Sequence, residues 1–127
     1  MEKKYLIDTN ILIYHLNDDI PDYSLSIIKE IIKNSLNISV IAKCELLGWN
    51  GYDETSFLEA KRFLGYAQIF NINDQIVDST IEIMRKWNLE LPDAIIAATA
   101  LLNNLILVTR NVKDFNKINN LEIYNPF

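Results

Sequence analysis

The chain has 127 residues, of which 50% are hydrophobic, and it carries one cysteine and a formal net charge of −5 at pH 7. This length predicts a single domain, residues 1–127, that can bury a hydrophobic core without the help of disulfides or metal ions. A lone cysteine excludes an intramolecular disulfide. The longest apolar run, residues 94–102, is far shorter than the ~20 residues of a membrane-spanning helix, and the first residues do not resemble a signal peptide, so we expect a cytoplasmic protein. The acidic balance argues mildly against a polyanionic partner unless some of the acids bind cations.

Apolar runs of strand type alternate with amphipathic segments along the chain. The apolar runs predict strands over residues 5–7, 36–41, 68–72, 105–108 and 121–124, the last of them at an edge. The amphipathic segments predict helices over residues 11–16, 23–34, 42–49, 53–66, 74–87 and 93–103, with a polar turn or short helical piece over 111–117. This alternation is typical of an α/β protein with a central, mainly parallel sheet covered by helices on both faces, a three-layer α/β/α sandwich.

Four carboxylates follow predicted strands or begin the next helix: Asp8, Glu45, Asp93 and Asp114. Each has a simpler explanation when taken alone. Asp8 and Asp93 could stabilise helix starts, Asp114 could cap a turn, and Glu45 could face solvent. Thr9 and Asn10 are also good N-cap types, and we assign the capping of the first helix to them.

Taken together, the carboxylates are harder to explain as independent caps, because ligands of parallel sheets bind beyond the carboxyl ends of the strands. Clustered carboxylates repel, so some would have a raised pKa unless a cation compensates them. Oxygen ligands without a histidine or thiol pattern favour the hard ions Mg²⁺ and Mn²⁺. Such ions activate water and stabilise the charge that develops on a phosphodiester.

Three segments carry a family resemblance: LIDTNILI at 6–13, LPDAIIAATA at 91–100 and LVTRNVKDF at 107–115. With Glu45 between them, they resemble the PIN-domain ribonucleases, and more narrowly the VapC-like toxins of type II toxin–antitoxin pairs. The similarity spans nearly the whole chain. It implies an endoribonuclease that hydrolyses RNA with Mg²⁺ or Mn²⁺, is usually a homodimer, and is inhibited by an antitoxin protein.

The resemblance also implies roles for individual residues. By position in the motifs, the four carboxylates Asp8, Glu45, Asp93 and Asp114 match the acidic catalytic and metal-binding site. Four polar residues match positions near that site that support the carboxylates or contact the substrate: Thr9, Ser39, Thr109 and Asn111.

Other polar and aromatic residues have simpler explanations. The only histidine, His15, is expected to be exposed or half-packed on the first helix and not a general base, and Cys44 to be a small buried residue. The cations Lys43, Arg110 and Lys113 flank the acids and could contact phosphates or be ordinary surface charges. For the segment of Leu46, Leu47, Trp49 and Tyr52, core packing is the first explanation, and an oligomer or antitoxin surface the second.

Two other functions remain open from the residues. In the first, Asp8 accepts a phosphoryl group in a phosphoryl-transfer domain, although the lysine that such chemistry expects at a strand end is absent: Val108 is followed by Thr109, Arg110 and Asn111. In the second, the chain is a non-catalytic RNA- or protein-binding module, and the acids are structural.

Overall fold

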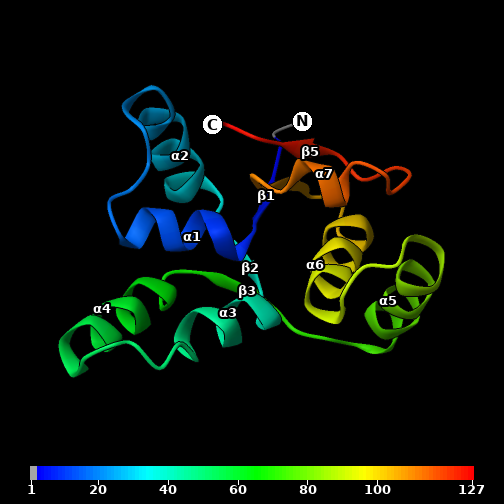
Figure 1. Cartoon of the computed structure of the whole chain (residues 1–127), viewed down its shortest axis with the longest axis horizontal. Helices are drawn as coiled ribbons and strands as arrows, with labels where there is room; N and C mark the ends of the chain where they lie inside the picture. Colours follow the sequence, from blue (N-terminus) through cyan, green and yellow to red (C-terminus); the bar gives the residue numbers. More distant parts are fainter. Residues whose placement is uncertain (1–2) are drawn as a thin grey trace.

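The computed structural model describes residues 3–127, and within them short parallel strands alternate with helices (Figure 1). The strands are β1 (Tyr5–Ile7), β2 (Asn37–Ser39), β3 (Gln68–Phe70), β4 (Ile106–Val108) and β5 (Ile123–Tyr124). The helices are α1 (Thr9–Leu16), α2 (Asp22–Asn34), α3 (Val40–Leu47), α4 (Glu54–Leu64), α5 (Asp74–Trp87), α6 (Leu91–Leu102) and α7 (Val112–Phe115).

The strands form two hydrogen-bonded groups, in the orders β1-β4-β5 and β2-β3, and every pair is parallel. Side chains join the two groups where no backbone ladder exists. The Asn37 amide donates to the carbonyl of Tyr5 at 2.9 Å, and the backbone N–H of Tyr5 donates to Ser35 Oγ at 3.1 Å. The β2-β3 pair therefore continues the layer of β1, and the expected mainly parallel sheet is confirmed.

Hydrophobic side chains pack on both faces of this layer, because successive residues of a strand point to opposite sides. Leu6 pairs in register with Leu107, and both belong to a core cluster with residues of α5, α6 and α7. The next pair, Ile7 and Val108, belongs to a second cluster with residues of α1, α2, α3 and α4. The strands thus lie between two groups of helices, as Figure 1 shows, and the three-layer α/β/α fold is confirmed.

Two differences from the sequence predictions lie where side chains cap helices, and a third lies at the start of α6, which has no side-chain cap. The predicted strand over 36–41 ends at Ser39, because Ser39 Oγ accepts a hydrogen bond from the backbone N–H of Ile41 and starts α3. The assignment of the first cap to Thr9 and Asn10 is wrong, since Asp8 is the N-cap residue of α1. Helix α6 begins at Leu91, so Pro92 lies in its first turn. Proline suits this position, because the backbone N–H groups of the first turn have no partner within the helix.

Within residues 3–127, none of the helices is both long and apolar enough to span a bilayer. That residues 1–127 form one domain stays a prediction, and its first two residues lie outside the described part of the chain.

Replacement of Asn37 by alanine should lower the free energy of unfolding by about 2 kcal/mol, because the buried Asn37 amide donates to both the carbonyl of Tyr5 and Ser35 Oγ. The carbonyl of Tyr5 then keeps only its longer contact of 3.5 Å with Ser35 Oγ. Asn34→Ala is the matched control. Asn34 donates only to the exposed Glu30 on the same helix, and its loss should cost less than about 0.5 kcal/mol. Urea unfolding of the two variants measures the difference, and equal costs would contradict the role given to Asn37.

Candidate active site

Asp8 is a buried carboxylate at the carboxyl end of β1, with 5% of its surface exposed. Its Oδ1 accepts a hydrogen bond from the backbone N–H of Thr9 at 2.8 Å, and its Oδ2 accepts one from Thr109 Oγ1 at 2.7 Å. The pKa of Asp8 is raised from 3.8 to about 6, mainly by burial and also by the charges of Asp93 and Glu45, while these two hydrogen bonds oppose the rise. Two other carboxylates, Asp93 and Glu45, therefore lie close enough to Asp8 to affect its pKa, as the sequence predicts.

Glu45 projects from α3 and is tied to the first helix by a side-chain hydrogen bond. Thr9 Oγ1 donates to Glu45 Oε1 at 2.8 Å, and Thr9 follows Asp8 directly in the chain. Glu45 itself is exposed, so its carboxylate stays open to solvent while one oxygen is held. Thr9 thus links the carboxylates of Asp8 and Glu45, one through its backbone N–H and one through its hydroxyl.

Asp93 occupies the first turn of α6 and is half-buried. Partial burial raises its pKa, and the charges of Glu45, Asp114 and Glu90 raise it further, in that order. The same residue contributes to the raised pKa of Asp8. The charges of Glu45 and Asp114 thus act on Asp93, and the charge of Asp93 acts on Asp8.

Thr109, Asn111 and Asp114 form a chain of hydrogen bonds after β4. Besides donating to Asp8, the buried hydroxyl of Thr109 accepts from the backbone N–H of Asn111 at 2.9 Å. The Asn111 amide donates to Asp114 Oδ2 at 3.0 Å. This chain connects the carboxylate after β1 to the one on α7.

Of the eight site residues predicted from the sequence, six belong to this hydrogen-bonded network, and Asp93 is linked to it through its charge. Ser39 is the exception among the polar positions, since its buried hydroxyl caps α3. The side chains do not form a ready ligand shell. Within residues 3–127, no three acidic, histidine or cysteine side chains are grouped closely enough to hold a metal ion. The assignment of Asp8, Glu45, Asp93 and Asp114 as catalytic and metal-binding residues stays a prediction.

Sequence reasoning missed Asn10 and Glu90. The Asn10 amide nitrogen lies 3.3 Å from Asp8 Oδ2 and 3.4 Å from Thr109 Oγ1, while its Oδ1 is buried with no hydrogen-bond partner. Glu90 precedes α6 and adds to the acidic field at Asp93. The place of Asn10 in the motif over 6–13 is a signal, although its type also suits a helix cap, whereas Glu90 precedes the motif over 91–100 and no sequence signal marks it.

Three residues to which the sequence assigns no catalytic role are His15, Cys44 and Arg110, and the structure agrees with only part of what was expected of them. The ring of His15 is half-buried and lies 5.1 Å from that of Phe63. Cys44 is exposed, so the expectation that it is buried is wrong: α3 turns it away from the core that holds Leu46. Arg110 donates to the Tyr14 hydroxyl at 2.9 Å, and its guanidinium also lies over the Phe127 ring.

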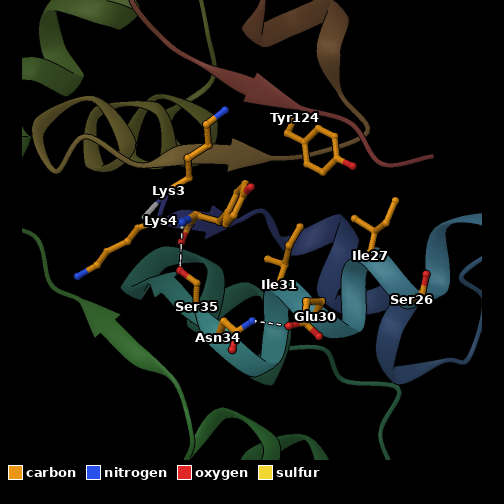
Figure 2. A pocket seen from close by; sticks show the side chains of 10 residues that line it. Lys3, Lys4, Ser26, Ile27, Glu30, Ile31, Asn34, Ser35 and Tyr124 are labelled. Carbon is orange, nitrogen blue, oxygen red and sulfur yellow. Dashed lines mark hydrogen bonds between the residues drawn. The ribbon is translucent and has the colours of Figure 1, made fainter. Parts of the chain in front are cut away.

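The structure also holds a cavity of about 790 Å³ beside the amino-terminal end of β1, away from Asp8 (Figure 2). Lys3, Lys4, Tyr124 and one side of α2 line it, and Glu30 in its wall bonds to Asn34. None of the predicted site residues is in this lining, so its size does not make it the candidate active site.

The donor chemistry of the carboxylate network fits a hard divalent cation. The neighbours that shift the pKa values of Asp8 and Asp93 are hydroxyl, backbone and carboxylate groups, with no cationic group of the described chain among them. The unpartnered Asn10 Oδ1 adds another oxygen acceptor beside Asp8. All-oxygen donors with excess negative charge suit Mg²⁺ or Mn²⁺, although the side chains must rotate to share one ion.

Burial also bears on the phosphoryl-transfer alternative. A phosphoryl acceptor needs an ionised, accessible oxygen, whereas both oxygens of Asp8 accept hydrogen bonds and burial raises its pKa. This environment disfavours Asp8 as a nucleophile.

Comparison with protein families gives the class of the protein. The PIN-domain family model matches residues 5–121, and the chain belongs to this family. The resemblance drawn from the sequence motifs is therefore confirmed. A comparison with curated proteins finds no match.

Several solved structures are similar over nearly the whole chain. A toxin–antitoxin complex from Klebsiella pneumoniae contains a chain with 31% identity and a TM-score of 0.78, with 98% of each chain covered. The VapBC2 complex of Rickettsia felis with promoter DNA has 27% identity and a TM-score of 0.80, covering 95% of this chain and 97% of that one. VapBC-1 of Haemophilus influenzae has 28% identity and a TM-score of 0.78, covering 96% and 97%.

The raised pKa of Asp8 predicts that the metal-free protein loses stability as the pH rises from about 4 to 7. Between the unfolded-state pKa and the folded-state pKa of about 6, the native state binds more protons than the unfolded state, so the free energy of unfolding falls with rising pH. The contribution of Asp8 is fully present below pH 3.8 and is lost above about 6, a difference of up to about 3 kcal/mol.

Asp8→Asn should remove the contribution of Asp8 to the slope of unfolding free energy against pH, and it should be more stable than the wild type at pH 7 in EDTA. Asp78→Asn, at an exposed position of α5, should keep the wild-type profile. Urea unfolding from pH 4 to 8 measures both. A profile of Asp8→Asn that is parallel to the wild type would contradict the buried, proton-binding state of Asp8.

Proposed function

We propose that this PIN-domain protein is a metal-dependent endoribonuclease that hydrolyses RNA phosphodiester bonds and acts as the toxin of a toxin–antitoxin pair. The PIN family and the toxin–antitoxin complexes among the similar structures support a nuclease toxin. The observation that carries the proposal is the buried Asp8 at a strand end, whose pKa is raised by burial and by the neighbouring Asp93 and Glu45. Such a site is costly for a fold to keep without a function.

In this proposal Asp8, Glu45, Asp93 and Asp114 would hold Mg²⁺ or Mn²⁺. When bound, the ion supplies Lewis acidity and positive charge at the phosphodiester. The neutral donors orient the carboxylates for this role: Thr109 holds Asp8, Thr9 holds Glu45, and Asn111 holds Asp114. Supporting hydrogen bonds of this kind fix ligand geometry in metal sites.

Hydrolysis also requires a group that accepts the proton of the attacking water. His15 packs against Phe63 and is not part of the carboxylate network. Carboxylate oxygens are the proton acceptors that the network offers at this position, and we assign the acceptance of this proton to one of them.

The partners follow from the same proposal. The substrate is RNA, and the inhibitor is an antitoxin protein, since the similar solved structures are toxin–antitoxin complexes. A homodimer and a cytoplasmic location complete the proposal, because the first is usual among the toxins that the motifs resemble and the second is where cellular RNA lies.

The purified wild-type protein should cut single-stranded RNA in Mg²⁺ or Mn²⁺, and EDTA should stop the reaction. Asp8→Asn, Glu45→Gln and Asp93→Asn should each lower kcat/KM by about 100-fold or more, the magnitude that follows removal of a group acting on transition-state charge. Glu45→Gln keeps an oxygen for Thr9 and so isolates the charge. Cleavage of an end-labelled RNA in single-turnover and steady-state assays gives these values.

Asp78→Asn, prepared in the same way, is the control for both the lost charge and contaminating nucleases, and it should cleave like the wild type. Metal-dependent cleavage that persists in all three site variants would show that another site or another protein cuts the RNA. RNA binding by the wild type without any turnover would favour the non-catalytic module instead.

A further inference from the structure

Trp49 is the exposed aromatic side chain nearest in sequence to Glu45, and 61% of its surface is open to solvent. It follows Gly48, which ends α3, so the helix that carries Glu45 also sets the position of Trp49. Core packing, the first explanation from the sequence, is correct for Leu46, which is 2% exposed, and wrong for Trp49. The exposed indole therefore needs another explanation.

Trp49 borders a groove that reaches the carboxylate network. The groove has a volume of about 320 Å³, and its lining includes Glu45 together with the apolar walls of Ile13 and Leu16 and the amide of Asn17. Trp49 and Tyr52 complete the wall on the side of α3. Because Glu45 belongs to both the groove lining and the carboxylate network, the groove opens next to the predicted site.

The indole is exposed and yet held in place. Its ring meets Tyr52 edge-on, with centroids 5.1 Å apart and planes at 83°, and the Tyr52 hydroxyl donates to the carbonyl of Leu46 at 2.9 Å. Gly51 lies directly against the indole, where a methyl group would overlap the ring carbons. A rigid, pre-positioned aromatic ring loses little conformational freedom on binding, which favours its use as a binding surface.

The chemistry of the groove suits a flat aromatic ring with polar edges. The volume is at the lower end of the ~300–1,000 Å³ of small-ligand sites, which fits one ring system. Aromatic and aliphatic walls can take its faces, and Asn17 can bond to its edge, since an amide both donates and accepts. An unpaired nucleobase has this shape and these groups.

Charge gives a further reason for base stacking. RNA-binding proteins usually attract phosphates with a basic surface, whereas this chain has a net charge of −5 and Arg110 is already bonded to Tyr14. Single-stranded nucleic acids are also bound by stacking on aromatic side chains, which does not depend on charge. Contact through a base would hold RNA beside carboxylates that repel its backbone.

We propose that Trp49 is the stacking surface for an unpaired base of the RNA next to the cleaved phosphodiester, with Asn17 at the edge of that base. This inference rests on the proposed RNA cleavage and names the part of the substrate that the groove binds. Trp49 and Asn17 thereby contribute to the choice of the cleavage position.

Steady-state cleavage of a single-stranded RNA tests this assignment. Trp49→Ala should raise KM about 10-fold and change kcat less than about 3-fold, and Trp49→Phe should recover most of the affinity, since it keeps an aromatic face. An RNA with an abasic nucleotide beside the cleaved bond should be cut alike by wild type and Trp49→Ala. Tyr66→Ala removes an aromatic residue that is 80% exposed on another surface and should behave like the wild type.

A second measurement does not depend on turnover. The chain has two tryptophans, so in a Trp87→Phe protein all tryptophan fluorescence comes from Trp49. Adding the RNA in EDTA should quench this fluorescence, and the abasic RNA should quench it much less. Gly51→Ala keeps the indole but displaces it, and should raise KM in the same direction as Trp49→Ala.

The two proposals fail in different ways. In one outcome the wild type cuts RNA, Trp49→Ala has the wild-type KM, and RNA does not change the fluorescence of Trp49. This outcome overturns the stacking role and leaves the nuclease function standing. The groove would then be assigned to a protein partner such as the antitoxin. If the wild type cuts no RNA, the proposed function fails. If normal RNA then still quenches the fluorescence of Trp49 more than abasic RNA does, the base-binding role of Trp49 is supported without the nuclease function. If the two RNAs quench it equally or not at all, both proposals are overturned.

Discussion

The hydrogen bond from Thr109 to Asp8 is the constraint on which the rest of the site depends. It joins the residue after β1 to the residue after β4 at 2.7 Å, and both side chains are buried. The same carboxylate caps α1 through Thr9, whose hydroxyl holds Glu45. One buried acid therefore fixes the relative positions of two strand ends, the start of a helix and a second carboxylate.

This arrangement is unfavourable for stability near neutral pH. Burial raises the pKa of Asp8, and the neighbouring acids raise it further instead of compensating it, so ionising Asp8 in the native state costs free energy. Asp93 is shifted in the same direction for the same reasons. A cation bound among these oxygens would offset the cost, and stability and metal binding are therefore linked in this fold.

Much of the fold could be predicted from hydrophobic periodicity. The helix predicted over residues 74–87 coincides with α5, and the buried strand before Thr109 lies where the apolar run places it. Two of the errors arise where a polar side chain bonds to the local backbone: Ser39 ends β2 early, and Asp8, not Thr9 or Asn10, caps α1. Sequence pattern gives the type of such residues but not the direction of their hydrogen bonds.

The site was predictable in its residue types and less so in its geometry. Strand-end placement brought Asp8, Glu45 and Asp93 together in the sequence argument, and the raised pKa values of Asp8 and Asp93, to which neighbouring carboxylates contribute, agree with it. The buried, unpartnered oxygen of Asn10 and the exposure of Trp49 could not be predicted, because both depend on how neighbouring side chains pack. An apolar residue type indicates what a side chain can pack against, and it does not say whether the fold covers it.

The claim that the carboxylates form one cation site is tested most directly by counting bound Mn²⁺, for which electron paramagnetic resonance of the free ion serves. The account predicts one or two saturable Mn²⁺ ions per wild-type chain at neutral pH, weaker binding at pH 5 as Asp8 takes up its proton, and at least 10-fold weaker binding in Asp8→Asn and Asp93→Asn. Asp78→Asn should bind like the wild type. Wild-type protein that binds no Mn²⁺, or binds it equally well after both substitutions, would contradict the account.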